Sequence, residues 1–347
     1  DQVERLLDVL PTTANVEATA KFGAPKQGWY AASTQAIIDV FGTKDAPRFA
    51  ALLAATSPQN SVEINLLNSL NIWKNWTAAG RPTDQKAIKA IMGQSVAGTQ
   101  GEKSVLDAWV NNSHRALSAP DPTRITLSGP KVDSFYRNLN LDVNRVTNDA
   151  WMANYAAISQ DNLRVSPSAL QLEAGNPGMT PTYAALTSRV RQGAGRTGMT
   201  GSEGQETIWS VVKPLTELQS ATGKPAREII EEGILTPDVI RGTPDFSTLL
   251  NTGENRRILQ SSGYGDALDR LSPYRWPETN INLSTAEQNE LLKTAARIED
   301  LGALRGRESA AKQFAVPRSG PKSGERAYVY ATEEVVPGEG IGHLPGV

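Results

Sequence analysis

Apolar residues recur at helical spacing through most of the first 160 residues, and this pattern constrains the fold more than any other feature. Within residues 61–79, the side chains of Leu66, Leu70 and Trp73 fall on one broad face, as in an amphipathic helix packed against a core. Residues 47–56 are nearly all apolar, which predicts a short helix buried on every side. No stretch there alternates polar and apolar residues as a half-buried strand does. The chain is therefore predicted to be mainly α.

Local start and stop signals divide this pattern into separate helices. Gly42 follows a helical stripe, so we expect that helix to stop there. Ser202 and Gln205 have the spacing of a capping box. Pro214 is expected to kink or interrupt the helix that they begin. Ser284 is predicted to cap a further strong helix.

Shifts in composition divide the chain into three parts. We expect a helical core over residues 1–173, an additional helical region over 174–305, and an extended Gly/Pro-rich tail over 306–347. The Gly- and Pro-containing stretch 175–181 favours a linker between the first two parts. Within the tail, only residues 326–332 are typical of a strand.

Residue types that are missing exclude several chemistries. Cysteine is absent, which excludes disulfides, thiolate catalysis, zinc–cysteine sites and cysteine-ligated iron–sulfur clusters. His114 and His343 are the only histidines, so a histidine-rich metal site is excluded as well. The longest apolar run, residues 49–55, is far shorter than the roughly 20 residues that a membrane span needs. We therefore expect no metal, no cofactor and no membrane partner.

The net charge of −2 and the isoelectric point of about 5.9 exclude a globally basic binder of nucleic acid. Local basic clusters are nevertheless present. Arg189, Arg191 and Arg196 lie close together, and further Lys and Arg residues gather between Arg305 and Arg326. A solvated surface is the favoured interpretation of both clusters, and a local basic face is the alternative.

The most informative stretch runs from Ile125 to Tyr155. A loop that contains Gly129 leads to Lys131 at the start of an amphipathic helix, and Asp149 follows 18 positions later at the next helix start. A lysine amine can attack a sugar C1′ once burial or a neighbouring cation lowers its pKa. A carboxylate at a helix start can stabilise positive charge on that sugar or activate water. Taken singly, a surface lysine and a plain N-cap explain the same two residues.

A polar turn, Ser57-Pro58-Gln59, follows the apolar run at 49–55. Pro58 is expected to end the buried helix and to leave Gln59 exposed at the mouth of a cleft. Asn60 comes next, where it can line a base pocket or form part of a polar helix face.

Together these motifs resemble the helix-hairpin-helix DNA glycosylases of the endonuclease III type, over roughly residues 30–160. In that family a Gly-x-Lys turn and a Val-Asp-x-His helix start bring a lysine and an aspartate together, and a Ser-x-Gln turn enters the space left by an extruded base. The resemblance implies a two-lobed helical fold with extra C-terminal helices. It implies that Lys131 and Asp149 are catalytic. It also implies DNA- or base-binding roles for Ser57, Gln59, Asn60, Gly129 and Trp151.

The sequence departs from the family pattern in three respects. Leu127 occupies the position of the first hairpin glycine, whose backbone amides approach a DNA phosphate. Trp151 stands where histidine is common. The cysteine cluster of some members is missing, so no iron–sulfur cluster is expected.

Two further groups are candidates for a base-binding site. Trp29 and Tyr30 precede a helix and could stack on a base, although core packing is the favoured interpretation. Gln205, Glu206 and Trp209 fall within about one helical turn, and Glu206 could supply a second carboxylate. Surface polarity is the favoured interpretation of that group.

The expected function is that of an enzyme which flips a DNA base, in particular a modified one, and cleaves or alters it with Lys131 and Asp149. One alternative is a phage pyrimidine hypermodification enzyme on the same fold, which leaves the strand intact. The other is a non-catalytic DNA-binding or virion-associated helical protein. The stretches 326–330 and 338–345 resemble the endings of bacteriophage accessory proteins, which implies a phage protein in the host bacterial cytoplasm or in the virion.

Overall fold

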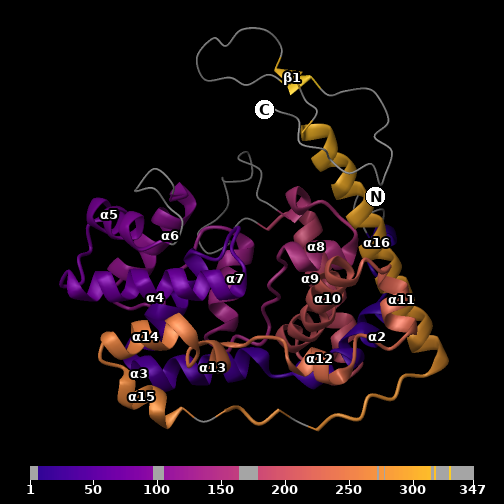
Figure 1. Ribbon diagram of the computed structural model, residues 1–347, viewed down its shortest axis with the longest axis horizontal. Coiled ribbons are helices and arrows are strands. Elements are labelled where there is room, and N and C mark those ends of the chain that lie inside the picture. Colours follow the sequence, from indigo (N-terminus) through magenta and orange to yellow (C-terminus); the bar gives the residue numbers. More distant parts are fainter. Residues whose placement is uncertain are drawn as a thin grey trace.

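The fold is mainly α, as the sequence predicts (Figure 1). The only β structure described is an antiparallel pair formed by β1 (Val316–Pro317) and β2 (Tyr328–Val329), and β2 falls inside the predicted strand. No helix in the described part of the chain is both long and apolar enough to cross a membrane. The computed structural model describes residues 7–96, 105–163, 179–271, 273–276, 278–313, 316–317 and 328–329. The predicted linker up to residue 178 and the phage-like ending, apart from residues 328–329, lie outside these residues.

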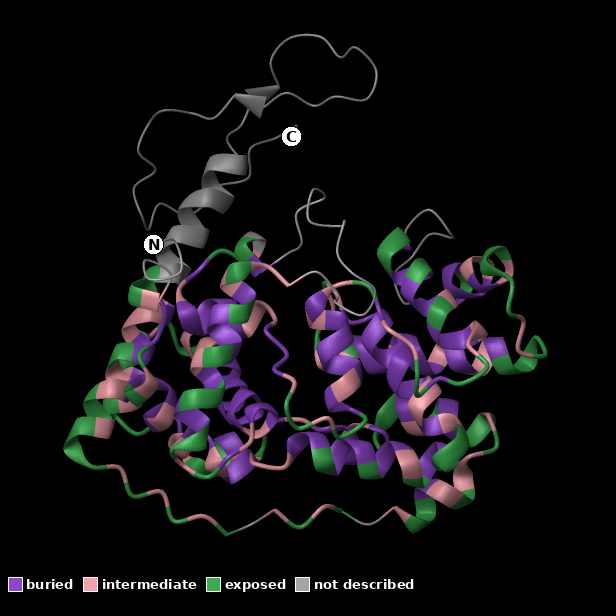
Figure 2. Ribbon diagram, turned by 180° about the vertical axis from the view of Figure 1, so that it is seen from behind, coloured by how far each residue is buried: buried purple, intermediate pink, exposed green. Residues whose placement is uncertain are grey.

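Two hydrophobic cores organise the helices, and buried residues concentrate on their inward faces (Figure 2). In the first core, Phe41 stacks on Phe49 at 4.1 Å between ring centroids, and Trp73 packs edge-on against Phe49 at 5.6 Å. We call the helices around this core the first cluster. They are α3 (Trp29–Ala55), α4 (Val62–Ala78), α5 (Gln85–Ser95), α6 (Asp107–Ser118), α7 (Pro130–Asn138), α13 (Phe246–Leu249), α14 (Gly253–Ser261) and α15 (Gly265–Arg270).

The second cluster joins a helix near the start of the described chain to helices from residue 150 onward. Ser284 and Glu287 form the predicted cap of its last helix, because each side chain accepts a hydrogen bond from the other residue's backbone N–H. The members are α2 (Thr13–Phe22), η1 (Ala24–Lys26), α8 (Ala150–Ala156), η3 (Gln160–Leu163), α9 (Pro181–Gly195), α10 (Gly201–Thr222), α11 (Ala226–Glu231), α12 (Pro237–Arg241) and α16 (Thr285–Gln313).

The two clusters do not follow the division predicted at residues 173 and 174. α2 packs against α9, α10 and α16, although these helices lie far apart in the sequence. Conversely, α13 and α14 return to the first cluster and pack on α3 and α4. Composition changes along the chain report local sequence, whereas each core is closed by segments from both halves of the chain.

α3 shows how a predicted stop becomes a kink. Gly42 has φ 76° and ψ 161°, a conformation that side chains with a Cβ rarely adopt, so the helix bends there and continues. Residues 49–56 are all at most 1% exposed, so the predicted burial on every side holds there, whereas Pro47 and Arg48 are half-buried. The helix ends at Ala55, before Pro58.

The start of α10 differs from the prediction by two residues. The capping box is formed by Thr200 and Glu203 instead of Ser202 and Gln205. The helix also continues through Pro214. An internal proline costs a helix about 3 kcal/mol, and the packing of α10 against α2, α3, α8 and α9 offsets that cost.

Replacing Gly193 with alanine is expected to destabilise the protein by about 3 kcal/mol, because α9 touches α2 there. A Cβ at this position would lie 2.3 Å from Val16 Cγ1. A Cβ at Gly195, on the same helix, would meet nothing within 4 Å, so Gly195→Ala is the matched control and should change stability by less than about 1 kcal/mol. Urea unfolding of both variants measures the difference, and equal stabilities would contradict this packing.

Candidate functional site

An open cleft lies where the two clusters meet. Its empty space, including the open mouth, is about 800 Å³. Its walls come from the start of α3, the turn after α3, the first turns of α4, α8 and α13, α7 from Lys131 to Phe135, and α10 from Gln205 to Glu217. Among the described residues, no group of three or more His, Cys, Asp or Glu side chains is arranged to hold a metal ion.

Aromatic rings cover much of the cleft wall. The Trp29 ring centroid lies 5.6 Å from that of Trp209 and 5.3 Å from that of Phe246. Trp29 and Tyr30 are at most 5% exposed, so they pack in the core, as favoured, and line the cleft as well. Aromatic surfaces of this kind bind flat heterocycles by stacking. The rings that line the cleft belong to Trp29, Tyr30, Phe135, Trp151, Trp209 and Phe246.

Lys131 is the second residue of α7 and lines the cleft. Gly129 precedes this helix with φ 95°, a turn that favours glycine. The ammonium group donates a hydrogen bond to Ser57 Oγ at 2.5 Å and lies 5.6 Å from the Phe135 ring centroid. Burial lowers the pKa of Lys131 to about 8, and the nearby charge of Asp149 opposes part of that shift. Its amine is thus neutral far more often than that of a surface lysine.

Asp149 is the N-cap of α8 and lines the same cleft. Its Oδ1 accepts hydrogen bonds from the backbone N–H groups of Trp151 at 3.0 Å and Met152 at 3.1 Å. Its Oδ2 has no partner among the described residues. Burial raises the pKa of this carboxyl group, against the opposing effects of Lys131 and the backbone donors. The residue therefore caps a helix with one oxygen and keeps the other available.

The structure brings Lys131 and Asp149 into one cleft without pairing them. No ion pair within 4.0 Å joins these two side chains in the described structure, so each keeps a side open to a bound molecule.

Thr147 precedes α8 but does not cap it, because its hydroxyl group donates a hydrogen bond to Asn138 Oδ1 at 2.6 Å. That contact instead ties the approach to α8 to the end of α7.

The turn after α3 reaches the cleft through Ser57 and Asn60. Ser57 is 7% exposed and positions Lys131, with its own hydroxyl group donating to Ala54 O at 2.8 Å. Gln59 is exposed, as predicted, but is not among the residues that line the cleft. Its backbone has a φ of 65°, and Ser57 and Asn60 of the same turn line the cleft instead.

The wall opposite Lys131 comes from α10, and there the favoured interpretation of surface polarity is wrong. Gln205 is 3% exposed and Glu206 is 2% exposed, and both line the cleft. The Glu206 carboxylate accepts the backbone N–H of Gly28 at 2.5 Å and of Tyr30 at 2.7 Å, so it holds the start of α3. Burial raises the pKa of Glu206 to about 8. The helical spacing of Gln205, Trp209 and Lys213 is the signal that could have identified this wall.

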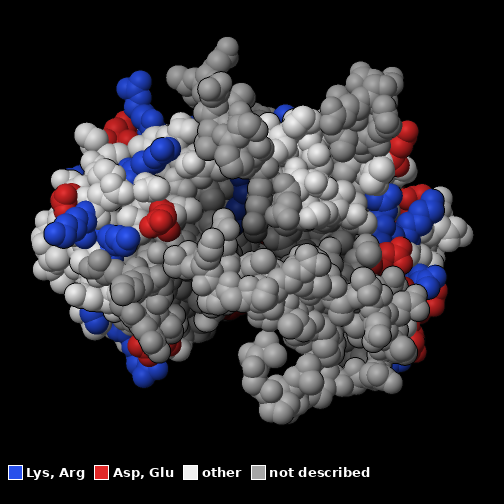
Figure 3. Space-filling model, turned by 90° about the horizontal axis from the view of Figure 1, so that it is seen from above, with Lys and Arg blue, Asp and Glu red and all other residues white. Residues whose placement is uncertain are grey.

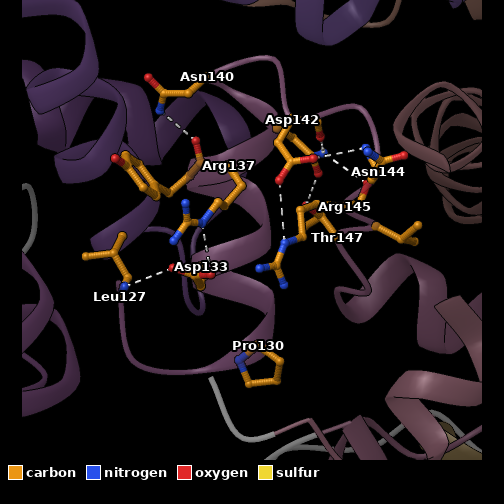
Figure 4. A network of polar contacts seen from close by, with 12 residues as sticks. Leu127, Pro130, Asp133, Arg137, Asn140, Asp142, Asn144, Arg145 and Thr147 are labelled. Carbon is orange, nitrogen blue, oxygen red and sulfur yellow. Dashed lines mark hydrogen bonds and ion pairs between the residues drawn. The ribbon is translucent and has the colours of Figure 1, made fainter. Parts of the chain in front are cut away.

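The hairpin before α7 uses its backbone donors internally. The N–H of Leu127 donates to Asp133 Oδ1 at 3.0 Å, and the N–H of Ser128 donates to Asn112 Oδ1 at 2.7 Å. The Asp133 carboxylate also accepts a hydrogen bond from Arg137 Nε at 3.4 Å. Figure 4 shows the Asp133 side chain between Leu127 of the loop and Arg137 of α7. Gly129 is not among the residues that line the cleft. These two N–H groups are therefore already occupied and do not face a ligand.

The arginine cluster after residue 188 is engaged with the protein. Arg189 donates to Thr13 Oγ1 at 3.2 Å, and Arg191 Nε donates to Asn144 O at 2.9 Å. Arg196 lies 3.7 Å from a Glu17 carboxylate oxygen. On the face in Figure 3, basic and acidic side chains of the described residues are mixed toward both ends. The basic side chains predicted to gather between residues 305 and 326 lie outside the described structure.

One family model matches the chain, over residues 13–216, and its description reads "Family of unknown function (DUF7178)". The matched range contains Lys131, Asp149, Gln205 and Glu206, and thus most of the cleft. Neither the curated proteins nor the solved structures yielded a match to the chain.

Proposed function

The chain belongs to the family of unknown function DUF7178, and we propose a function for it from its own cleft. It is an enzyme that receives an extruded, modified DNA base and acts on that base with Lys131 and Asp149. The proposed relationship is to the helix-hairpin-helix DNA glycosylases, with the two clusters as the two lobes of that fold. The proposed partner is DNA, and the proposed setting is a phage-infected bacterial cytoplasm or a virion.

A single observation carries this proposal. Lys131 and Asp149, at the starts of two successive helices, line one aromatic cleft without forming a direct ion pair. A lysine with a pKa of about 8 has about a tenth of its amine neutral at pH 7, and the adjacent carboxylate has an unpartnered oxygen. Aromatic walls suit a flat base, which must leave the stack before the glycosidic bond can be reached.

The chemistry follows from these two groups. The lone pair of the neutral Lys131 amine forms a bond to the sugar C1′, while the glycosidic bond breaks and the base leaves with its electron pair and takes up a proton. Asp149 stabilises the positive charge that develops on the sugar and accepts the proton lost by the attacking amine. The nitrogen lone pair then opens the C1′–O4′ bond, the remaining amine proton passes to O4′ as a hydroxyl group, and an imine is left between lysine and sugar.

A second candidate is a non-catalytic DNA-binding or virion-associated protein, and one observation favours it. The Leu127 and Ser128 N–H groups of the hairpin are held by Asp133 and Asn112, so they do not supply a phosphate site. A base-altering enzyme that leaves the strand intact uses the same cleft as the first candidate. The products distinguish the three, since excision leaves an abasic sugar, modification leaves an altered nucleotide, and binding leaves both unchanged.

Borohydride trapping on a panel of modified-base oligonucleotides tests the proposal. Hydride reduces the imine and leaves a stable protein–DNA adduct. The trapping rate is expected to rise as the pH increases through about 8 and then to level off, because the neutral amine is the nucleophile and burial has lowered its pKa. A lysine with the ordinary pKa of 10.5 would instead keep gaining rate well above pH 9. Absence of any adduct with every oligonucleotide at low salt would contradict lysine chemistry.

A further inference from the structure

We propose that Gln205 selects the base in the cleft by donating a hydrogen bond to a carbonyl oxygen on its edge. Bases with a carbonyl next to a ring N–H, here called lactam-edge bases, would then bind in preference to bases with an amino group next to a ring nitrogen acceptor. The inference rests on the proposed function, because it assumes that the cleft holds a base. It concerns α10, which lies outside the stretch that carries the glycosylase resemblance.

The Gln205 amide turns its oxygen toward the Tyr30 hydroxyl group. The Tyr30 hydroxyl group donates to Gln205 Oε1 at 2.6 Å. Gln205 Nε2 then has no hydrogen-bond partner among the described residues, although the side chain is only 3% exposed and lines the cleft. Buried amide donors are normally paired. An unpaired donor in the wall of an aromatic cleft is therefore suited to a ligand acceptor.

The support behind Gln205 is rigid. Glu206 holds the Tyr30 backbone N–H at 2.7 Å, and the Tyr30 ring packs 6.4 Å from that of Phe135 between centroids. Contacts from both α3 and α10 therefore hold Tyr30, whose hydroxyl group contacts the Gln205 amide. A preorganised donor discriminates more strongly than a mobile one, because no reorganisation is needed when the ligand binds.

Asn60 lines the same cleft and carries a free acceptor. Its Nδ2 donates to Thr56 O at 2.8 Å, which leaves its Oδ1 without a partner in the described structure. A donor from Gln205 and an acceptor from Asn60 match a C=O beside an N–H, as in uracil, thymine, guanine and hypoxanthine. Cytosine and adenine present an amino donor beside a ring acceptor, which reverses the pattern. With such a base, the Gln205 donor faces another donor and stays unpaired, at a free-energy cost.

Matched nucleosides test this inference through the fluorescence of the tryptophans that line the cleft. Deoxyuridine is compared with deoxycytidine, and deoxyinosine with deoxyadenosine, because each pair differs in edge chemistry at nearly constant size. We expect the lactam-edge member of each pair to bind about tenfold more tightly, the discrimination typical of one good hydrogen bond. Equal affinities within both pairs, preference for the amino-edge member, or no binding of any nucleoside would overturn the inference.

Two variants assign the preference to the named residues. Gln205→Met keeps the side-chain length and removes the amide, so the affinity ratio should fall to about one. Gln219→Met, on the same helix but outside the cleft, should leave the ratio unchanged. Asn60→Ala, at a half-buried turn, should reduce the ratio even if Gln205→Met fails to fold. A tenfold ratio that survives both cleft variants would refute the assignment.

The outcomes separate this inference from the proposed function. A lysine adduct on DNA without any edge preference refutes only the role of Gln205. An edge preference without any adduct refutes only the lysine chemistry, and leaves the cleft as a base-binding site.

Discussion

Lys131→Ala is expected to eliminate the borohydride adduct, a loss on the order of a thousandfold or more, as for removal of a nucleophile from other enzymes. The cleft holds one other lysine, Lys213, but its ammonium group is engaged with Glu217 at 2.6 Å. The negative charge of Asp149 attracts the Lys131 ammonium group and favours its charged form. This attraction does not cancel the effect of burial, which lowers the pKa of Lys131. No other amine in the described cleft is therefore equally ready to attack.

The alanine variant should remain folded, which makes the test specific. Lys131 makes one hydrogen bond to Ser57, and its burial disfavours its charged form, so removing it relieves a desolvation cost. Lys86→Ala is the matched control, because that lysine is exposed on α5, away from the cleft. An adduct of normal yield with Lys131→Ala would transfer the chemistry to another amine and refute the proposed role.

Asp149→Asn is expected to reduce turnover by about a hundredfold to a thousandfold while leaving stability nearly unchanged. Asparagine caps helices about as well as aspartate, so the bonds to the Trp151 and Met152 N–H groups are retained. The substitution removes the charge that stabilises a cationic sugar, an effect typically worth a few kcal/mol in a site shielded from water. Single-turnover kinetics and thermal unfolding measure the two quantities separately.

DNA affinity should change little in Asp149→Asn, because phosphate contacts supply most of such binding. Asp84→Asn is the matched control, since Asp84 caps α5 through the Ala87 N–H at 2.9 Å and is exposed. If wild type and Asp149→Asn give identical products at identical rates, Asp149 is a helix cap only. If wild type binds DNA but neither protein alters it, the binding-protein alternative is correct.

Local pattern predicted most of the helices, and the resemblance to the glycosylases predicted that Lys131 and Asp149 share one cleft. Helical periodicity reports which side of a segment is buried, and residues 49–55 are buried as that rule requires. The start of each of two successive helices is a local feature too, so Gly129 and Asp149 mark them correctly in the sequence.

The assignment of Gln205 and Glu206 to a surface failed for a physical reason. Their polarity is typical of exposed positions. No pattern in the neighbouring residues indicates that the start of α3 packs against α10. That contact is what buries Glu206, because its carboxylate accepts the Gly28 and Tyr30 N–H groups from 176 to 178 positions away. The same packing pairs the Tyr30 hydroxyl group with Gln205 and so directs the amide donor.

Periodicity, caps and turns depend on neighbours within a few residues, so the chain's mainly α character and the positions of Lys131 and Asp149 at helix starts can be read from the linear sequence. The division into two cores, the depressed pKa of Lys131 and the polar wall of the cleft depend on segments that meet across the fold. Burial is a property of the assembled protein, because it requires α3, α7, α8 and α10 to exclude water from the same space. The spacing of Lys131 and Asp149 is a local feature of the sequence. The cleft around them, with its defined hydrogen-bond donors and acceptors, is formed by long-range packing.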